Sequence, residues 1–598
     1  MRDFSAPLRP GVWVTALLAA SATVIVASAV AGWEPALCAG LLLNYVADSL
    51  LYTKDPKLAT WLGQCHLAAA HRALFRQTFA VLGWVVAAEP PPWAILLSLA
   101  AVVLIHITHG GYRMMSVRNR RLVRGRLRWV NLDVEGIRQS ALPLPPPLPA
   151  VGPIAGPRVI LHVDVFLVLG LFLSWASASM APVIVAVALV LVSSGWVAWR
   201  VVQRHHLLRQ LPSCAEENAR VHAALERLAP QVAVYFSGGP AMTYQLNVWL
   251  GTIDRLHQPT VIILRQAHHL KHLLPTTTPI VVLPRARDVE EHQVPSLRVA
   301  LYPTTVIKNN HMLRLRGIRH VFINHGDGDK SVTYSPVHRV FDEVWVAGEA
   351  ACDRYLNHGE GIRRDQLVQV GRPQLAHIRR AQMAPDANGV PTVLYAPTWE
   401  GNFDGVDYSS VGPLGEAIIE ALLRGPRLVR ILFKPHPATG SRLPRAAVSL
   451  QRIEARLREA PGAHRIVETG PDALYDAFNE ADVLIADISS VVADFLASGK
   501  PYLVTNPRAV PVQALRREFP STSAAGIVEQ DATNVAELIA DAVGTDSLRE
   551  RREQLATYFL GTPVADPVEE FADEVDRACA RASHAGILDQ PKHLEVPR

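Results

Sequence analysis

The stretch A-D-I-S-S-V-V-A-D-F-L-A-S-G-K-P, from Ala486 to Pro501, decides the fold of the C-terminal half of the chain. Its first two residues are also the last two of the short apolar run A-D-V-L-I-A-D at 481–487, which is typical of a buried parallel strand. The strand ends in an Asp-Ser-Ser turn, and a helix is expected to begin directly afterwards. Free backbone N–H groups at a helix start, together with two small hydroxyl groups, bind phosphate. The turn therefore predicts a site for a phosphorylated ligand, whereas the alternative is an ordinary N-cap by Asp487 or Ser489.

Apolar strand-like runs alternate with helical or mixed segments on both sides of this turn. Such alternation predicts βαβ units that build parallel sheets. A polar break at 385–391 separates two series of runs. We therefore expect an α/β fold with two doubly wound Rossmann-type domains and a cleft between them. The runs lie at 232–236, 260–264, 279–283, 298–302, 320–324, 343–347 and 367–371, and then at 392–396, 429–433, 481–486 and 501–505.

The N-terminal third of the chain is much more apolar than the rest. Hydrophobic residues make up 49% of the 598 residues, and the excess lies before residue 200. Because about 20 apolar residues in a helix cross a bilayer, we expect an α-helical transmembrane domain of about six spans. Asp48, Arg76 and Asp164 fall inside these segments and would need partners there. For the second and third segments the alternative is an interfacial or re-entrant helix. The expected spans lie near 12–31, 36–52, 73–88, 92–108, 159–178 and 182–199.

The charges of the joints between these spans predict their orientation. The joints near Glu34, at 89–92 and near Ser179 carry no Lys or Arg, whereas the opposite joints are basic. Cytoplasmic loops collect Lys and Arg, so both ends of a multi-pass cell-membrane protein, and its catalytic part, are expected in the cytoplasm. The basic joints contain Lys54, Lys57, Arg72 and Arg76, then Arg113, Arg118, Arg120, Arg121, Arg124, Arg126 and Arg128, and finally Arg200, Arg204 and Arg209.

The expected organisation follows from these patterns. The basic loop at 113–128 is an orientation signal or a contact with anionic lipid, and the Pro-rich stretch at 142–157 is an extended connector. The domains are a transmembrane domain at 1–200 that includes the loop and connector at 109–157, a linker helix at 201–230, α/β domains at 231–384 and 385–565, and a C-terminal helix and tail at 566–598.

Composition excludes several classes of function. The five cysteines form no CxxC pair and no metal-ligand spacing, so neither a disulfide framework nor a zinc site is expected. A net charge of +5 is small for this length and does not indicate a nucleic-acid partner. The chain has no G-x-G-x-x-G and no Walker A motif. We expect no metal and no cofactor.

Residues that follow parallel strands are where an α/β protein binds its ligand. Here four strands are followed by residues whose side chains could bind a ligand or take part in a reaction. They read N-H-G-D-G-D-K at 324–330, Y-A-P-T-W-E-G at 395–401, F-K-P-H-P at 433–437 and D-I-S-S-V-V-A-D-F at 487–495. In this order and spacing, over about 231–560, the motifs resemble those of the CDP-glycerol glycerophosphotransferase family of teichoic acid polymerases and primases.

The resemblance implies a GT-B architecture, an acceptor bound mainly by the first α/β domain, and a CDP-linked donor bound by the second. It makes His325 and His436 the counterparts of two essential histidines. The first motif of the family usually continues H-G-T-P-L-K, whereas this chain has H-G-D-G-D-K, so that Lys330 is an approximate match. The implied partners are CDP-glycerol or a related CDP-polyol and a lipid-linked polymer acceptor at the membrane.

The implied reaction is attack of an acceptor hydroxyl on the β-phosphorus of the donor, with release of CMP. His325 is the expected base, and an imidazole with an ordinary pKa near 6.5 suits that task. Asp327 or Asp329 could orient it or bind a cation. The residues expected to bind the donor diphosphate are His436, Lys434, Ser489, Ser490, Asp487, Thr398, Arg372 and Lys330.

Other interpretations remain open at this point. Each histidine could have only a structural role in its turn, and Trp399 could belong to the hydrophobic core. Asp494 could cap neighbouring backbone groups, and Arg372 could form a salt bridge between domains. A GT-B glycosyltransferase that uses a nucleotide sugar is the alternative enzyme, because fold alone does not fix the donor. A transporter or flippase with a nucleotide-binding domain is the alternative from another class, suggested by the carboxylates of Asp48 and Asp164.

Overall fold

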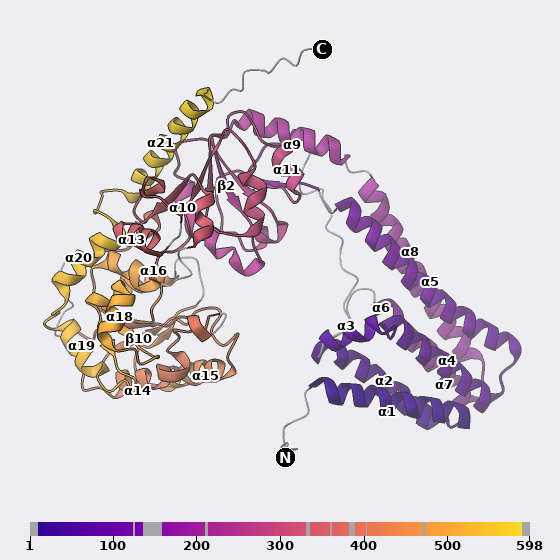
Figure 1. Cartoon of the computed structure of the whole chain (residues 1–598). Helices are drawn as coiled ribbons and strands as arrows, with labels where there is room; N and C mark the ends of the chain where they lie inside the picture. Colours follow the sequence, from indigo (N-terminus) through magenta and orange to yellow (C-terminus); the bar gives the residue numbers. More distant parts are fainter. Residues whose placement is uncertain are drawn as a thin grey trace, which may run out of the picture. The chain divides into compact units, whose positions relative to one another are not determined.

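The chain divides into two compact units, which are described separately (Figure 1). The first comprises Met1–Arg126 and Ile137–Cys214, and the second Leu127–Gly136 and Ala215–Arg598. The structure is a computed structural model, and it describes residues 10–54, 56–123, 126–135, 158–209, 213–329, 335–358, 361–381, 389–401, 404–468 and 473–588. The Pro-rich stretch at 142–157 and Lys330 lie outside these residues, as does most of the polar break at 385–391.

The first unit is helical. Four of its helices are long and apolar enough to cross a membrane, at Trp13–Ala31, Glu34–Tyr52, Pro92–Asn119 and Ala181–Arg209. Six spans were expected, and two of the expected segments do not meet these criteria. The expected segment at 73–88 lies in the helix Ala69–Ala88, which carries Arg72 and Arg76. The expected segment at 159–178 contains the helix Asp164–Ser177, whose 14 residues give about 21 Å of helix against about 30 Å of hydrocarbon. The helices are α1 (Pro10–Ala31), α2 (Glu34–Lys54), α3 (Pro56–Gln64), α4 (Ala69–Ala88), α5 (Pro92–Val123), α6 (Arg158–Leu161), α7 (Asp164–Ser177) and α8 (Ala181–Arg209).

A buried ionic network joins helices of this unit. Arg76 is fully buried, with Nη2 3.6 Å from Oδ2 of Asp164. The Tyr45 hydroxyl donates a hydrogen bond to Oδ1 of Asp164 (2.6 Å), and Nε of Arg72 donates to Oδ1 of Asp48 (2.6 Å). The carboxylates that would need partners inside a bundle therefore have them, and their presence is explained without a transport pathway.

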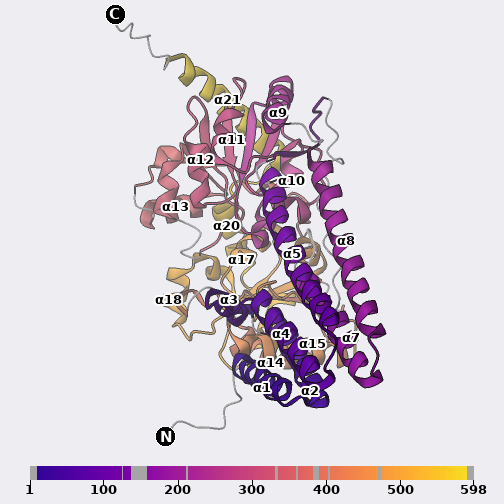
Figure 2. The ribbon, with the colours of Figure 1, turned by 90° about the vertical axis from the view of Figure 1, so that its right-hand side faces the viewer.

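Helices α5 and α8 lie side by side along much of their length, as both ribbon views show (Figure 2). Their outer faces carry exposed apolar side chains such as Leu96, Val103, Leu191 and Val192. Exposed apolar faces of this kind are what lipid, rather than water, would cover.

The second unit contains two sheets. The larger has the strand order β1-β4-β3-β2-β5-β6-β7-β8, and the smaller β11-β10-β9-β12-β13-β14. All neighbouring pairs are parallel except β1 with β4. The strands are β1 (Arg128–Val130), β2 (Val232–Phe236), β3 (Thr260–Leu264), β4 (Ile280–Val282), β5 (Val299–Tyr302), β6 (Arg319–Phe322), β7 (Glu343–Val346), β8 (Leu367–Gln369), β9 (Thr392–Ala396), β10 (Arg430–Phe433), β11 (Arg465–Ile466), β12 (Val483–Ala486), β13 (Tyr502–Thr505) and β14 (Gly526–Val528).

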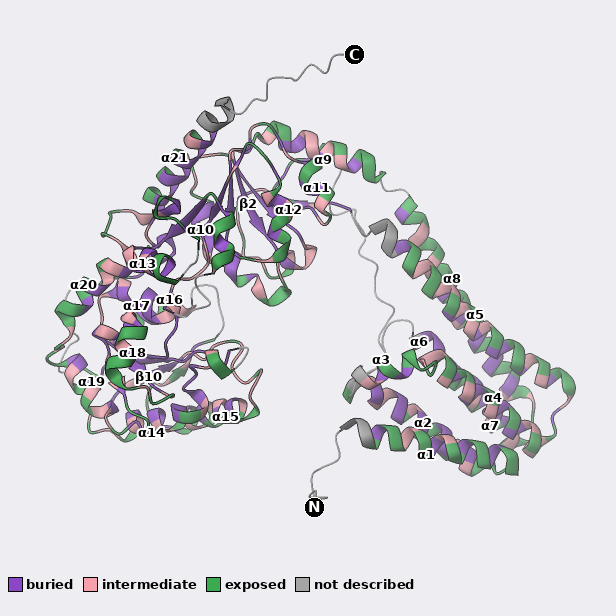
Figure 3. Cartoon of the chain, viewed as in Figure 1, coloured by how far each residue is buried: buried purple, intermediate pink, exposed green. Residues whose placement is uncertain are grey.

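Every strand expected from the sequence is present, and the expectation of two Rossmann-type α/β domains is confirmed. The central strands β2, β3 and β9 are buried along their whole length, as expected of parallel strands that are covered on both faces. Figure 3 shows this for β2, which is drawn in purple. In the first lobe the chain order reverses between β2 and β5, and in the second between β9 and β12. Ligands bind beyond the carboxyl ends of strands at such switch points.

Helices cover the sheets of both lobes. The first lobe holds α9 to α13 and the second α14 to α19. The bounds are α9 (Cys214–Leu228), α10 (Tyr244–Ile253), α11 (Ala286–Glu291), α12 (Asn310–Leu313), α13 (Glu349–His358), α14 (Glu416–Arg424), α15 (Pro444–Glu459), α16 (Ala473–Glu480), α17 (Ser490–Phe495), α18 (Val512–Glu518), α19 (Val535–Val543), α20 (Arg549–Leu560) and α21 (Pro567–Leu588).

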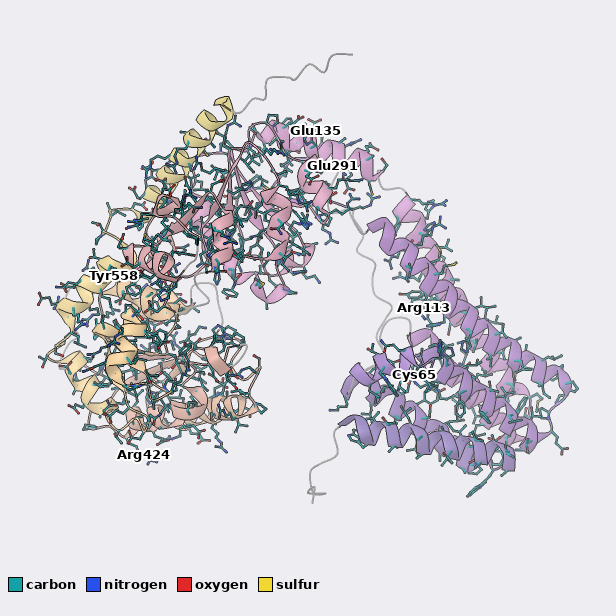
Figure 4. All side chains as sticks on the ribbon, viewed as in Figure 1. Cys65, Arg113, Glu135, Glu291, Arg424 and Tyr558 are labelled. Carbon is teal, nitrogen blue, oxygen red and sulfur yellow. The ribbon has the colours of Figure 1, made fainter. Side chains whose placement is uncertain are left out.

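The last two helices connect the lobes. The Tyr558 hydroxyl of α20, labelled in Figure 4, donates to Asp353 of α13 (2.6 Å). Helix α21 returns to the first lobe (Figure 1), where the Phe571 ring lies 5.1 Å from that of Trp249 and 5.2 Å from that of Trp345. The first lobe is thus completed by the C-terminal end of the chain.

The first lobe also takes one strand from far upstream. Strand β1, which the sequence did not predict, pairs antiparallel with β4 at the edge of the sheet, with Trp129 opposite Val281. The backbone N–H of Leu127 donates to Oε1 of Glu217 (2.8 Å), and Nδ2 of Asn131 donates to the Thr276 carbonyl (2.6 Å). A segment that lies between the helices α5 and α6 of the first unit is therefore part of the α/β fold.

Candidate functional site

The loop that carries His325 begins where β6 ends. Asn324 has a φ of +52°, a left-handed conformation that Asn adopts more readily than most residues. Its Oδ1 accepts a hydrogen bond from the His325 N–H (2.8 Å), and its carbonyl accepts one from Nε1 of Trp249 (2.5 Å). These two bonds hold the sharp turn that sends the chain away from the sheet at His325.

The His325 imidazole lies against the first turn of α10. Its Nε2 is 3.2 Å from Nε2 of Gln245, and its ring is edge-on to that of Tyr244 at 5.8 Å between centroids. Burial and the nearby Arg372 guanidinium lower the pKa of His325 to about 4, against the opposing effect of the Pro303 carbonyl. The pKa is thus below the ordinary value assumed from the sequence, so the imidazole is neutral at neutral pH and can accept a proton.

The two aspartates of this loop pair with an arginine. Arg354 contacts the carboxylate of Asp327 and donates from Nη1 to Oδ1 of Asp329 (3.1 Å). The other oxygen of Asp329 accepts the backbone N–H of Ser521 in the second lobe (2.7 Å). Burial raises the pKa of Asp329, although Arg354 opposes this. The carboxylates therefore fix the shape of the loop and attach it to the second lobe.

The loop touches the Asp-Ser-Ser turn of the second lobe. A Cβ placed on Gly328 would lie 3.2 Å from the backbone N and Cα of Ser490, and one on Gly326 would lie 3.6 Å from its Oγ. Glycine at these positions lets the two backbones approach. The exits of β6 and β12, one from each lobe, thus meet at Ser490.

The Asp-Ser-Ser turn is held from behind by Asp487. This residue is fully buried, and its carboxylate accepts hydrogen bonds from the N–H groups of Thr398 (2.8 Å) and Ser410 (3.1 Å) and from the Thr505 hydroxyl (2.5 Å). Burial raises its pKa, and these donors oppose the rise. Asp487 therefore joins the exits of β9, β12 and β13.

The expected side-chain cap of the following helix does not form. Ser489 is the N-cap residue of α17 by position, but no side-chain capping bond is present. Its hydroxyl donates instead to the Asp487 carbonyl (3.2 Å). Since Asp487 binds the neighbouring loops, neither residue caps α17 with its side chain.

His436 follows β10 on the same edge of the sheet. Its Nδ1 accepts the N–H of Ala438 (3.1 Å), and its ring stacks on that of Trp399 with centroids 6.0 Å apart. Strand β10 is two positions from β12 in the sheet, so these exits are about 10 Å apart. Lys434, half-buried in the same loop, has its pKa lowered by burial.

Glu400 fixes the loop that contains His436. Its side chain is buried and accepts the backbone N–H groups of Gly440 (2.9 Å) and Leu443 (3.1 Å). Glu400, Gln245 and Arg354 were not predicted as site residues. A glutamate directly after Thr398-Trp399 was the only signal for the first, while the other two come from helices whose packing a single sequence does not reveal.

Arg372 forms a salt bridge between the lobes. It follows β8, and its Nη2 donates to Oδ1 of Asp494 in α17 (2.8 Å). Both side chains are buried, and the Tyr475 hydroxyl lies 3.5 Å from the other oxygen of Asp494. This is the salt-bridge alternative considered for Arg372; a contact with diphosphate stays a prediction.

A pocket opens in the first lobe beside the His325 loop, at the carboxyl ends of β6, β7 and β8. It offers charged and aromatic groups together where an acceptor was expected. Its lining includes Trp249, Gly326, Asp327, Trp345, Arg354 and Arg372.

The four strand exits therefore lie on facing edges of the two lobes, with contacts at Ser490, Ser521 and Asp494. Residues 327–539 match the sequence model of the CDP-glycerol:poly(glycerophosphate) glycerophosphotransferase family. The match contains three of the four motifs and begins two residues after His325. It confirms the resemblance that the motifs indicated and, with it, the expectation of a glycerophosphotransferase enzyme.

The solved structures that match this chain are distant in sequence. The wall teichoic acid polymerase TagF is 11% identical, with a TM-score of 0.41 over 61% of this chain and 94% of that chain. A glycosyltransferase from Rickettsia africae is 11% identical, with a TM-score of 0.36 over 59% and 98%. The UDP-GlcNAc 2-epimerase from Neisseria meningitidis is 11% identical, with a TM-score of 0.38 over 58% and 99%. No curated protein matches this chain.

Proposed function

We propose that this chain is a membrane-anchored phosphotransferase that moves glycerol phosphate, or a related polyol phosphate, from a CDP-linked donor to a hydroxyl group of a lipid-linked cell-wall polymer. The observation that carries the proposal is the approach of Gly328 to the backbone N of Ser490, because it places the loop of a neutral histidine against a turn suited to phosphate. The family match of residues 327–539 supports the same reaction.

In the proposed step the acceptor hydroxyl attacks the β-phosphorus of the donor. A new oxygen–phosphorus bond forms, the bond from that phosphorus to the bridging oxygen breaks, and CMP leaves with the electron pair. His325 takes the hydroxyl proton, which its neutral imidazole can accept. Lys434, Ser489, Ser490 and His436 are proposed to bind the diphosphate and stabilise the charge on departing CMP.

The other residues that were predicted to bind the CDP-linked donor are given two different roles. Asp487 is proposed to position the turn through its bonds to Thr398 and Ser410 rather than to touch the donor. Thr398 and Arg372 keep their predicted roles as donor-binding residues, Arg372 from its place beside Asp494, and Lys330 keeps its role as an approximate family match. No metal is assigned to the reaction.

The membrane unit is proposed to hold the α/β unit on the cytoplasmic side, next to a lipid-linked acceptor. The apolar helices α1, α2, α5 and α8 support this location, and the basic joints Arg113 to Arg128 and Arg200 to Arg209 support the orientation.

The test is release of CMP from CDP-glycerol by the full chain in detergent. His325→Ala and His436→Ala should remain folded and lose at least about 100-fold in rate, which is within the range for a general acid–base group. His358→Ala, at an exposed position at the end of α13, is the matched control and should keep its rate. Normal turnover by either site variant would remove that histidine from the mechanism.

A donor panel separates this proposal from the nucleotide-sugar alternative. CDP-glycerol and CDP-ribitol are compared with UDP- and GDP-sugars under the same conditions. Turnover of a nucleotide sugar alone, without any CDP-polyol, would replace the phosphotransferase by a glycosyltransferase.

A further inference from the structure

Gln245 occupies a position that the proposed reaction does not yet use. It lies in the first turn of α10 with 9% of its surface exposed. Its amide nitrogen is 3.2 Å from Nε2 of His325 and 3.2 Å from the Tyr244 hydroxyl oxygen. The neutral imidazole can accept one amide proton at Nε2 and the tyrosine hydroxyl can accept the other, so both amide protons are committed.

The amide oxygen of the same side chain takes part in neither of these hydrogen bonds. Oε1 of Gln245 is buried, and among the described residues it has no hydrogen-bond partner. A buried carbonyl oxygen without a donor is costly, and a bound group that donates a hydrogen bond to it would remove that cost. Oε1 can only accept a hydrogen bond, so the group it would bind must be a donor such as a hydroxyl.

We propose that Gln245 determines acceptor specificity: its Oε1 binds the hydroxyl next to the attacking one, so that the chain selects acceptors that end in a vicinal diol. The inference rests on the proposed function and narrows its acceptor. On binding, the attacking hydroxyl replaces the Gln245 amide proton at Nε2 of His325, and the adjacent hydroxyl donates to Oε1.

The spacing suits such a pair of hydroxyl groups. The nitrogen and oxygen of one carboxamide lie about 2.3 Å apart, so Oε1 is within about 5.5 Å of Nε2 of His325. Adjacent hydroxyl oxygens about 3 Å apart can reach two acceptors at this separation with hydrogen bonds of about 2.8 Å. An alcohol with a single hydroxyl group would leave Oε1 without a hydrogen-bond donor. A phosphate oxygen is itself an acceptor and could not donate to Oε1.

Two soluble acceptors differ only in the hydroxyl at issue. Decyl glycerol phosphate ends in a vicinal diol, and decyl 3-hydroxypropyl phosphate has the same length and charge without the middle hydroxyl. For the full chain in detergent with CDP-glycerol, kcat/KM should favour the diol by about 10- to 100-fold, the discrimination expected when a site built for a hydroxyl loses it. In Gln245→Met the preference should fall to less than about 3-fold.

The ratio of the two acceptors is measured on one preparation, so it does not depend on the folded fraction. The matched control is Gln366→Met, which removes another buried glutamine, one that donates to the Phe341 carbonyl (2.9 Å). It should keep the wild-type preference. Equal rates for the two acceptors in the wild type, or an unchanged preference in Gln245→Met, would overturn the inference.

Calorimetric binding of the same two compounds separates this inference from the proposed function, because it needs no turnover. If neither acceptor releases CMP but the wild type binds the diol at least about 5-fold more tightly and Gln245→Met does not, the phosphotransferase assignment fails and the diol site stands. If CMP is released equally from both and binding shows no preference, the phosphotransferase stands and the diol site fails.

Discussion

Nη2 of Arg372 lies 2.8 Å from Oδ1 of Asp494, and this buried ion pair joins the end of β8 in the first lobe to α17 in the second. Both side chains are 7% exposed. Helix α17 begins at the Asp-Ser-Ser turn, so the pair ties the first lobe to the element that follows the proposed phosphate site.

Removing one partner of this ion pair should lower the free energy of unfolding far more than removing both. Arg372→Met or Asp494→Leu leaves a buried charge alone and should cost about 3–5 kcal/mol, whereas the double variant should recover much of that loss. The measurement is the calorimetric unfolding of the full chain in detergent. A double variant as unstable as the sum of the two single variants would show that the charges do not interact.

Gly328→Ala should damage catalysis by disturbing the contact of the loop with the other lobe. The new methyl group would lie 3.2 Å from the backbone of Ser490, which cannot move without moving α17. We expect CMP release to fall by about 10-fold or more, since small misplacements of reacting groups are costly. Gly251→Ala, whose Cβ would meet nothing within 4 Å, is the control. Equal rates for the two variants would mean that the lobes do not need this contact.

Acid should destabilise the α/β unit through its buried histidines. Burial lowers the pKa of His325, His269 and His338 to about 4 from an ordinary value of 6.5. As the pH falls from about 6.5 toward 4, the unfolded chain takes up protons that the folded chain does not, so stability falls; above 6.5 these groups contribute no pH dependence.

The measurement for this effect is the melting temperature at pH 7.5 and pH 5.0. His325→Gln should lose less stability between the two values than the wild type, because one of the groups is gone. His358→Gln, changed at an exposed position, should behave as the wild type. If His325→Gln shows the full acid loss, the imidazole is not held neutral by its surroundings.

Strand β1 should be needed for the stability of the first lobe. Trp129 is 4% exposed although it lies in a three-residue edge strand. Trp129→Ala should therefore cost about 3–5 kcal/mol and lower the melting temperature of the α/β unit. Val130→Ala, changed at the exposed end of the same strand, should cost less than about 1 kcal/mol. Similar losses in both would argue that the strand contributes no buried contact.

The sequence predicted the strands of the α/β unit well because buried parallel strands are short apolar runs with polar exits. The run at 260–264 and the run at 392–396 agree with β3 and β9 residue for residue. Strands β1, β11 and β14 were missed because two or three residues at a sheet edge carry no apolar run, and Arg128 and Arg465 are unusual strand residues.

The candidate site was predicted where it depends on local sequence. The loops of His325 and Ser490 were each located from the strand that precedes them, β6 and β12, and the two loops are in contact. What could not be predicted depends on tertiary contacts. Arg354 binds two carboxylates from 25 or more residues away. The lowered pKa of His325 comes from burial and from Arg372, which is 47 positions further along the chain, and no local sequence pattern encodes either.

The pairing of β1 with β4 determines how early the sheet of the first lobe can be completed during synthesis of the chain. It is synthesised before α7 and α8, yet its partner β4 appears only about 150 residues later, on the far side of those two helices. If α8 crosses a membrane, a chain in which α7 did not cross with it would leave Trp129 in the opposite compartment from Val281. The sheet of the first lobe could then never close its edge, so the first lobe would be complete only in chains in which β1 and β4 lie on the same side of the membrane.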